Sequence, residues 1–118
     1  MKKVLLIPDS FKGTMSSAEI CDIMERAILE NYKDIDIVKI PVADGGEGSV
    51  DAFLAAMGGE KVKIKVKGPF FNEIDSFYGI IEGGKTAVIE MAAASGLPLV
   101  EGKANPSKTT TYGVGQLM

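Results

Sequence analysis

The chain has 118 residues, of which 46% are hydrophobic and 25% charged, and its formal net charge at neutral pH is −3. This composition fits a soluble globular protein without a basic surface or an apolar run near the roughly 20 residues of a membrane helix. We therefore expect a cytoplasmic protein with no nucleic-acid or membrane partner. Having no histidine and one cysteine, the chain cannot by itself form a histidine-based triad, a histidine metal site, a thiolate zinc cluster or a disulfide.

The first 40 residues predict a strand, a helix and a second strand. The segment 3–7, which contains the continuous apolar run VLLI, is typical of a strand buried on both faces of a parallel sheet. A capping-box motif at 16–19 precedes apolar residues at helical spacing, which predicts a helix over 17–31 with Cys21 in the core. A second strand is expected at 35–40, and this order indicates a right-handed parallel βαβ unit.

The loop after the first predicted strand, PDSFKG at 8–13, carries three candidate site residues. In open α/β sheets ligands bind at this edge. Asp9 could hold a cation or orient a hydroxyl, Ser10 could donate to a carboxylate or phosphate, and Lys12 could neutralise phosphate. A plain connecting loop with a surface lysine explains the spacing equally well.

A second glycine-rich loop, ADGGEGS at 43–49, opens a helix that Gly58-Gly59 should end. Its glycines would expose amides to an anion, and the Asp44 and Glu47 carboxylates could hold Mg²⁺ or accept a hydroxyl proton. The alternative is an acidic first turn with turn glycines. We favour a ligand site because both loops follow strands at one sheet edge. The candidate residues are Asp44, Gly45, Gly46, Glu47 and Gly48.

The pattern changes near residues 59–60, where we expect a domain boundary. The strict alternation at 61–67, KVKIKVK, predicts a half-buried strand whose lysines form a solvated, edge-protecting face rather than a basic binding stripe. Two further strands are expected at 74–81 and 86–91, joined by Gly83-Gly84. These features predict mixed or antiparallel pairing in this half of the chain.

The segment GIIEGGKT at 79–86 matches the phosphate-loop pattern G-x-x-x-x-G-K-[ST]. That pattern binds phosphate only where a helix begins at the lysine, so that backbone amides converge. The residues after Lys85 instead indicate a strand, so we expect a hairpin turn. A phosphate-loop NTPase would require a helix there.

Two pairs of polar residues near the end of the chain could belong either to the packing of the fold or to a ligand site. Glu90 and Ser95 flank the Ala-rich segment 92–94, where close packing and a site role are equally plausible. Thr110 and Thr111 place hydroxyls at the start of a predicted helix. Helix capping is the simpler explanation for them, and phosphate binding is the alternative.

The sequence predicts only two parallel strands and a last helix without a terminator, so we expect part of a longer protein. The expected fold class is α/β, with a parallel Rossmann-like βαβ segment followed by the start of a second α/β domain. We expect residues 1–59 to be the N-terminal part of the first domain and residues 60–118 the beginning of an inserted second one.

Taken together, these segments resemble the bacterial type I glycerate kinase family, specifically its N-terminal portion. The resemblance covers the whole chain and keeps the order and spacing of four motifs. These are PDSFKG at 8–13, ADGGEGS at 43–49, KTAVIEMAAASGL at 85–97 and TTTYGVGQL at 109–117. Ser49 stands where threonine is commoner in the family, and Gln116 where glutamate is commoner.

The resemblance implies transfer of the ATP γ-phosphoryl group to a hydroxyl of D-glycerate with Mg²⁺, giving phosphoglycerate and ADP. It also implies two α/β domains with the site between them. The expected catalytic residues are Lys12, Asp44 and Asp9, and the expected metal ligands are Asp44 and Glu47. The expected substrate- or phosphate-binding residues are Ser10, Gly45, Gly46, Glu47, Gly48, Thr110 and Thr111.

Phosphoryl transfer depends on positioning and charge neutralisation, which a chain without histidine can supply. We expect Lys12 and Asp44 to converge on one rim. The chain alone should be inactive, lack contacts with the remainder of the same protein and be prone to self-association. A non-catalytic α/β binding module that keeps the fold is the alternative.

Overall fold

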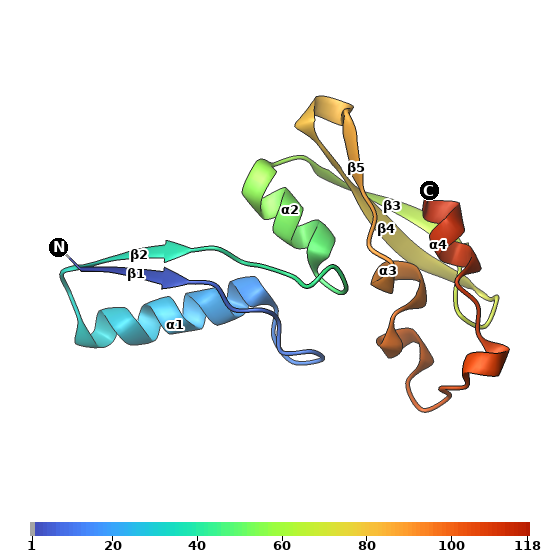
Figure 1. Cartoon of the computed structure of the whole chain (residues 1–118), viewed down its shortest axis with the longest axis horizontal. Coiled ribbons are helices and arrows are strands. Elements are labelled where there is room, and N and C mark those ends of the chain that lie inside the picture. The colour runs from blue at the N-terminus through green and yellow to red at the C-terminus, as the bar shows by residue number, and fades with distance from the viewer. Residues whose placement is uncertain (1) are drawn as a thin grey trace. The chain divides into compact units, whose positions relative to one another are not determined.

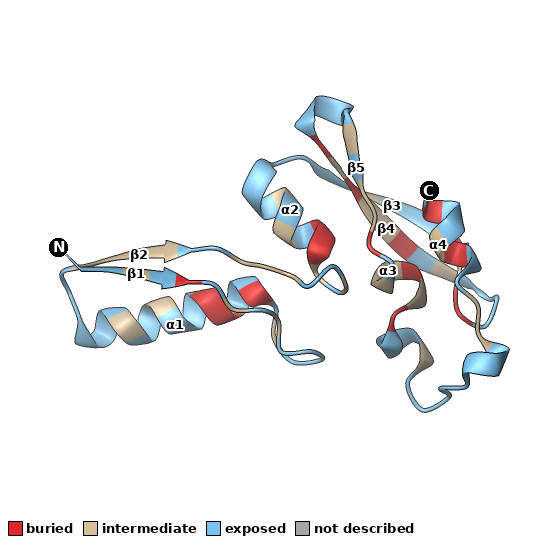
Figure 2. Cartoon of the chain, in the orientation of Figure 1, coloured by how far each residue is buried: buried red, intermediate tan, exposed pale blue. Residues whose placement is uncertain are grey.

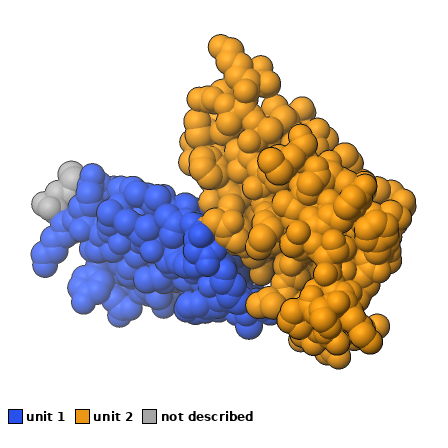
Figure 3. Space-filling view, turned by 45° about the vertical axis from the view of Figure 1, so that its right-hand side comes forward, with its two compact units in different colours: residues 1–44 blue, residues 45–118 orange. Residues whose placement is uncertain are grey.

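The computed structural model describes residues 2–118, and the chain forms two compact units, residues 1–44 and 45–118 (Figure 3). The first unit holds a parallel two-stranded sheet, and the second holds an antiparallel three-stranded sheet. The predicted α/β class, with a parallel βαβ segment followed by antiparallel strands, is therefore confirmed. Within residues 2–118, no helix combines the length and apolarity needed to cross a membrane.

The first unit consists of β1 (Lys2–Leu6), α1 (Ser17–Asn31) and β2 (Ile35–Lys39). β1 and β2 pair in parallel, and Leu6 lies opposite Lys39 in the register. In Figure 1, α1 runs along the strand pair. The predicted order and the helix bounds are confirmed.

The start of α1 follows from its capping box. The Ser16 hydroxyl accepts a hydrogen bond from the Glu19 amide at 3.2 Å, and a Glu19 carboxylate oxygen accepts one from the Ser16 amide at 2.8 Å. Two orphan amides of the first turn are thus satisfied. Ile20 and Cys21 are buried, and burial raises the pKa of the Cys21 thiol, which fits the predicted core role rather than a reactive one.

The prediction that β1 is buried on both faces is wrong for this chain. Leu6 is buried, whereas Leu5 is 53% exposed and Ile7, just after the strand, is 50% exposed. Figure 2 shows most of β1 as exposed. A parallel sheet is normally covered on both faces by crossover helices. The described part of this unit contains one such helix, so the side chains that α1 does not cover remain open.

The second unit contains three helices and three strands. The strand order is β3-β4-β5, with both pairs antiparallel. The elements are α2 (Ser49–Met57), β3 (Glu60–Lys67), β4 (Glu73–Ile81), β5 (Thr86–Val88), α3 (Ala92–Ser95) and α4 (Tyr112–Leu117), with 3₁₀ turns at Glu82–Gly84, Leu97–Val100 and Pro106–Lys108. The strand that was predicted over 86–91 ends early, because the chain turns into α3.

One face of this sheet forms the core of the second unit. Val66 on β3, Ala94 on α3 and Leu117 on α4 are buried against one another. Gly113 lets α4 approach β3, since a Cβ at this position would overlap the carbonyl oxygen of Lys67. Val66 of the alternating pattern in β3 therefore faces a packed layer as predicted, whereas Ile64, which was expected on the same buried face, is 38% exposed.

The other face of the sheet is covered by α2 at one end and is open to solvent elsewhere. A Cβ on Gly79 of β4 would lie 3.1 Å from the Val50 side chain of α2, which marks this contact. Lys61 forms an ion pair with Asp51 of α2, and Lys65 lies 3.1 Å from Asp75. β3 is an edge strand with exposed lysines, as expected of a solvated, edge-protecting face.

The hairpin expected at the phosphate-loop-like segment is confirmed. β4 ends at Ile81, a tight turn follows, and β5 begins at Thr86. The Glu82 carboxylate closes the turn by accepting a hydrogen bond from the Thr86 hydroxyl at 2.6 Å. Because no helix begins at Lys85, the phosphate-loop NTPase alternative is wrong.

Candidate functional site

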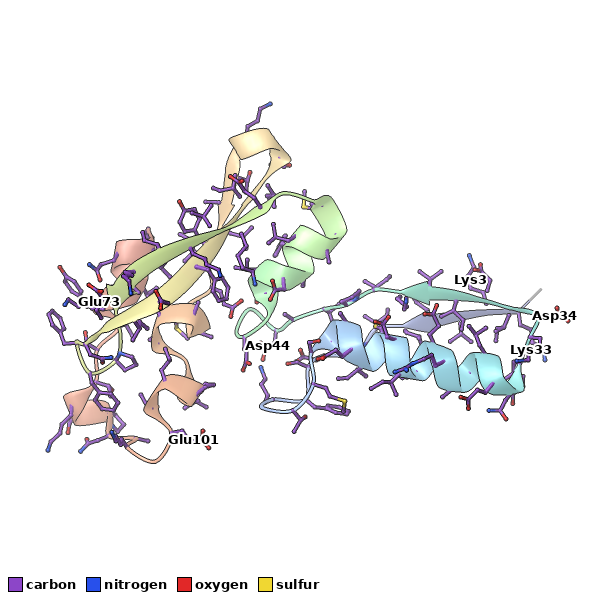
Figure 4. The ribbon with its side chains drawn as sticks, turned by 180° about the vertical axis from the view of Figure 1, so that it is seen from behind. Lys3, Lys33, Asp34, Asp44, Glu73 and Glu101 are labelled. Atoms are coloured by element: carbon purple, nitrogen blue, oxygen red, sulfur yellow. The ribbon has the colours of Figure 1, made fainter. Side chains whose placement is uncertain are left out.

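An ion pair joins the two loops that follow β1 and β2. Lys12 Nζ lies 3.2 Å from Asp44 Oδ2, and the two side chains are 53% and 56% exposed. Asp44 is labelled in Figure 4 at the end of the segment after β2. The predicted convergence of these residues, which are 32 positions apart, is confirmed.

Lys12 lies in a tight turn with its own hydrogen bonds. The Phe11 amide donates to the Met15 carbonyl at 2.9 Å, and the Thr14 amide donates to the Phe11 carbonyl at 2.8 Å. Gly13 adopts a φ of +77°, a conformation that side-chain-bearing residues rarely take. This turn presents the Lys12 ammonium group on a short, closed loop.

A buried hydroxyl fixes the bases of both loops. Ser17 Oγ donates to the Pro8 carbonyl at 2.6 Å and accepts from the Val42 amide at 3.0 Å, and Ser17 is 8% exposed. Pro8 and Val42 lie just before the segments that carry Lys12 and Asp44. The sequence interpretation missed this role. Its one signal was the helical spacing of Ser17 with the buried residues Ile20 and Cys21.

The remaining polar groups of the first loop differ in their bonding. Asp9 Oδ1 accepts a hydrogen bond from the Ser10 amide at 2.7 Å. Ser10 Oγ is buried and has no hydrogen-bond partner among residues 2–118. An unpaired buried polar atom costs about 1–3 kcal/mol, so this hydroxyl is a candidate for a ligand contact.

Residues 45–48 of the glycine-rich loop belong to the second unit and lead into α2. Gly45 and Gly48 have φ values of +94° and +89°, and an added Cβ would meet no atom within 4 Å at either position. Backbone conformation rather than space therefore requires glycine. Ser49 Oγ donates to the Gly46 carbonyl at 2.8 Å and closes the turn, and Glu47 is exposed.

Glu90 is buried next to the start of α2. It is 2% exposed, and its Oε2 accepts a hydrogen bond from the Val50 amide at 3.1 Å. The sequence interpretation left packing and a site role equally open for Glu90. Its signal was a carboxyl group within the otherwise apolar run AVIEM at 87–91.

The two threonine candidates lie at the start of α4. The Thr110 hydroxyl accepts a hydrogen bond from the Tyr112 amide at 3.1 Å, which agrees with the capping explanation. Thr111 is exposed and forms no side-chain cap. Phosphate binding by either residue stays a prediction.

Carboxylates are the only anionic side chains available for a cation. Among residues 2–118, no group of three or more Asp, Glu or Cys side chains lies within reach of one ion. Mg²⁺ usually binds one or two carboxylates together with water and substrate phosphates. The donor chemistry of Asp44 and Glu47 fits this requirement.

Comparisons with known proteins agree on one family. Residues 4–118 match the model of the glycerate kinase family. The chain is 44% identical over 117 residues to a glycerate kinase of Haemophilus influenzae and to a glycerate 2-kinase of Escherichia coli. It also resembles the crystal structure of a protein named glycerate kinase 2 from Salmonella typhimurium, with 41% identity and a TM-score of 0.75. Each match covers 98% of this chain and 31% of the other protein, so the chain spans about a third of their length.

Proposed function

Since the chain belongs to the glycerate kinase family, we propose that it forms the N-terminal part of an ATP-dependent glycerate kinase. The reaction would transfer the γ-phosphoryl group of ATP to a hydroxyl of D-glycerate, yielding phosphoglycerate and ADP in organic acid metabolism. The expected partner of this chain is the remaining two-thirds of a family-length protein. ATP use and a lone buried cysteine fit a cytoplasmic location.

The ion pair between Lys12 and Asp44 carries this proposal. Exposed ion pairs contribute about 0–1 kcal/mol to stability, so this pair does little to hold the fold together. It nevertheless brings opposite charges together from two loops that follow parallel strands, at the sheet edge where α/β proteins bind ligands. A chemical role explains that placement better than a stabilising one.

The residues suit phosphoryl transfer, which needs positioning and charge neutralisation. Lys12 would bind an anionic oxygen of phosphate or of the glycerate carboxylate, and Asp44 or Asp9 would orient the attacking hydroxyl. The unpaired Ser10 hydroxyl supplies a donor for an anionic group. Gly45, Gly46, Glu47 and Gly48 would contact substrate through their backbone, with Thr110 and Thr111 as further phosphate ligands.

Asp44 and Glu47 would hold Mg²⁺, which neutralises phosphate charge when bound. Asp44 has two oxygens, one of which lies beside Lys12. Lys12 and the cation would therefore share the task of balancing negative charge.

A coupled assay of ADP release by the family-length protein, with D-glycerate and MgATP, tests the proposal. Lys12→Ala and Asp44→Asn should each lower kcat/KM by more than about tenfold, because each removes a charge acting on the reacting groups. The matched control is Lys3→Ala. Lys3 forms an exposed ion pair of 3.1 Å with Asp36 in the same unit, on the strands themselves. This control should leave kcat/KM unchanged.

Two results would contradict the proposal. Site variants that stay within about tenfold of the wild type would remove Lys12 and Asp44 from the mechanism. A wild-type protein that binds glycerate or MgATP in calorimetry without turnover would favour the non-catalytic binding module.

A further inference from the structure

We propose that Glu90 is a positioning residue that holds the glycine-rich segment 45–48 in its working conformation. This inference rests on the proposed function, because the segment is there assigned to substrate binding. It concerns residues 45–118 alone, which form one compact unit.

Glu90 is the one charged residue among the buried side chains of the described residues, at 2% exposure. A buried carboxyl group without hydrogen bonds is costly. The structure supplies a backbone donor, since the Val50 amide lies 3.1 Å from Glu90 Oε2. Glu90 follows β5, whereas Val50 lies in the first turn of α2, so this bond links segments that are 40 positions apart.

The local sequence of α2 cannot provide this hydrogen bond. The first amides of a helix need acceptors, and the residue before the helix usually supplies one through its side chain. Here that residue is Gly48, which has no side chain and forms no side-chain cap. Glu90 takes over this task from a distant part of the chain.

The glycine-rich segment needs such an anchor. Glycine has more backbone freedom to lose than any other residue, and Gly45 and Gly48 both adopt left-handed conformations. The segment leads directly into the turn of α2 that Glu90 holds. Fixing Val50 therefore fixes one end of the segment. The conformational entropy that the segment would lose on binding a ligand is reduced accordingly.

Glu90 also occupies one of the helix-terminal amides to which an anion could bind. A helix N-terminus attracts negative charge, but the Val50 amide already donates to the Glu90 carboxyl group. The Val50 amide is therefore not available to a substrate phosphate. The buried carboxyl group acts through the segment without touching the substrate.

The test compares three variants of the family-length protein. Glu90→Ala removes the acceptor, whereas Glu90→Gln keeps a side-chain oxygen for the Val50 amide. Ser76→Ala is the matched control, because Ser76 is also buried in this unit and donates to the Ala93 carbonyl at 2.8 Å, on the other face of β4. All assays are run where each variant is folded by circular dichroism.

Glu90→Ala should lower kcat/KM for glycerate phosphorylation by at least about tenfold, while Ser76→Ala and Glu90→Gln stay within about threefold of the wild type. Hydrogen exchange at the Val50 amide should accelerate in Glu90→Ala alone. Retained activity in Glu90→Gln would show that the hydrogen bond to the Val50 amide, and not the negative charge of Glu90, is required.

Three outcomes overturn the inference. If Glu90→Ala behaves like Ser76→Ala in an active protein, Glu90 is merely structural and the proposed function survives. If Glu90→Gln fails as badly as Glu90→Ala, the charge matters rather than the hydrogen bond. If the wild type does not phosphorylate glycerate, the proposed function fails and this role for Glu90 fails with it.

Discussion

The two units of this chain bury their apolar residues to different extents. In the first unit the buried apolar side chains are Leu6, Ile20 and Cys21, while Leu5 and Ile7 remain about half exposed. In the second unit, helices pack against both faces of the antiparallel sheet, and these helices all lie within residues 45–118. The buried apolar side chains there are Val50, Val66, Ile81, Ala94 and Leu117.

Sheet topology explains the contrast. Antiparallel strands connect through short turns, so a sheet and its covering helices can form from one short segment. Parallel strands require crossovers, and each crossover helix covers one face. A parallel sheet of two strands is therefore left half covered. The proposed catalytic residues Lys12, Asp44 and Asp9 lie on this less buried unit, whose loops depend on polar ties such as Ser17.

The largest expected effect probes the packed core of the second unit. Gly113→Ala should lower the free energy of unfolding by about 3 kcal/mol, because its Cβ would overlap the Lys67 carbonyl oxygen. Urea denaturation of the 118-residue chain measures the loss. Gly115→Ala in the same helix is the control, since its Cβ would meet no atom within 4 Å. A similar loss in both variants would mean that α4 does not pack as closely as described.

A second pair of variants compares the two sheets directly. Val66→Ala should destabilise the chain by about 2 kcal/mol, because Val66 is 2% exposed in the core. Leu5→Ala should cost less than about 0.5 kcal/mol, since Leu5 is 53% exposed. Thermal and urea unfolding measure both. If Leu5→Ala proves as costly as Val66→Ala, the face carrying Leu5 is covered and the contrast between the units disappears.

A third test concerns the polar tie in the first unit. Ser17→Ala leaves the Pro8 carbonyl and the Val42 amide without their partner, and should cost about 1–3 kcal/mol. Hydrogen exchange at the Val42 amide should accelerate at the same time. Ser10→Ala is the control, because the Ser10 hydroxyl is buried without a partner and its loss should be neutral or stabilising. Unchanged exchange at Val42 would show that other contacts hold the loops.

The smallest expected effect is a pH dependence of the free energy of unfolding, which comes from an ion pair on the surface of the first unit. A hydrogen bond from Lys39, at 2.9 Å, lowers the pKa of the Asp22 carboxyl group. Because this pKa is lower in the folded than in the unfolded state, protons bind preferentially to the unfolded state in acid. The stabilisation is present above the unfolded pKa of about 3.9 and is lost as pH falls through the folded value.

Lys39→Met removes this contribution. Urea unfolding from pH 7 to pH 2 should show wild type and variant converging in stability as the pH falls. The two stability curves would run parallel if Lys39 paired with neither Asp22 nor Glu25 in solution. Asp22→Asn should reproduce only part of the behaviour of Lys39→Met, since it leaves the second ion pair of Lys39, 2.6 Å from Glu25 Oε2, in place.

Local sequence determined most of the elements and their order. The capping box at Ser16 and Glu19, the alternation in β3 and the glycines after Met57 act over a few residues, so their consequences could be read directly. The meeting of Lys12 and Asp44 could also be anticipated, because parallel strands end at one sheet edge. These features depend on covalent neighbours or on simple topology.

Only the tertiary structure decided how deeply each element is buried and which side chains support the loops. The apolar run of β1 indicated burial on both faces, but burial depends on partners that this stretch of sequence does not contain. The ties at Ser17 and Glu90 join residues 25 and 40 positions apart. Such hydrogen bonds satisfy buried backbone groups created by the packing itself, so no local pattern specifies them.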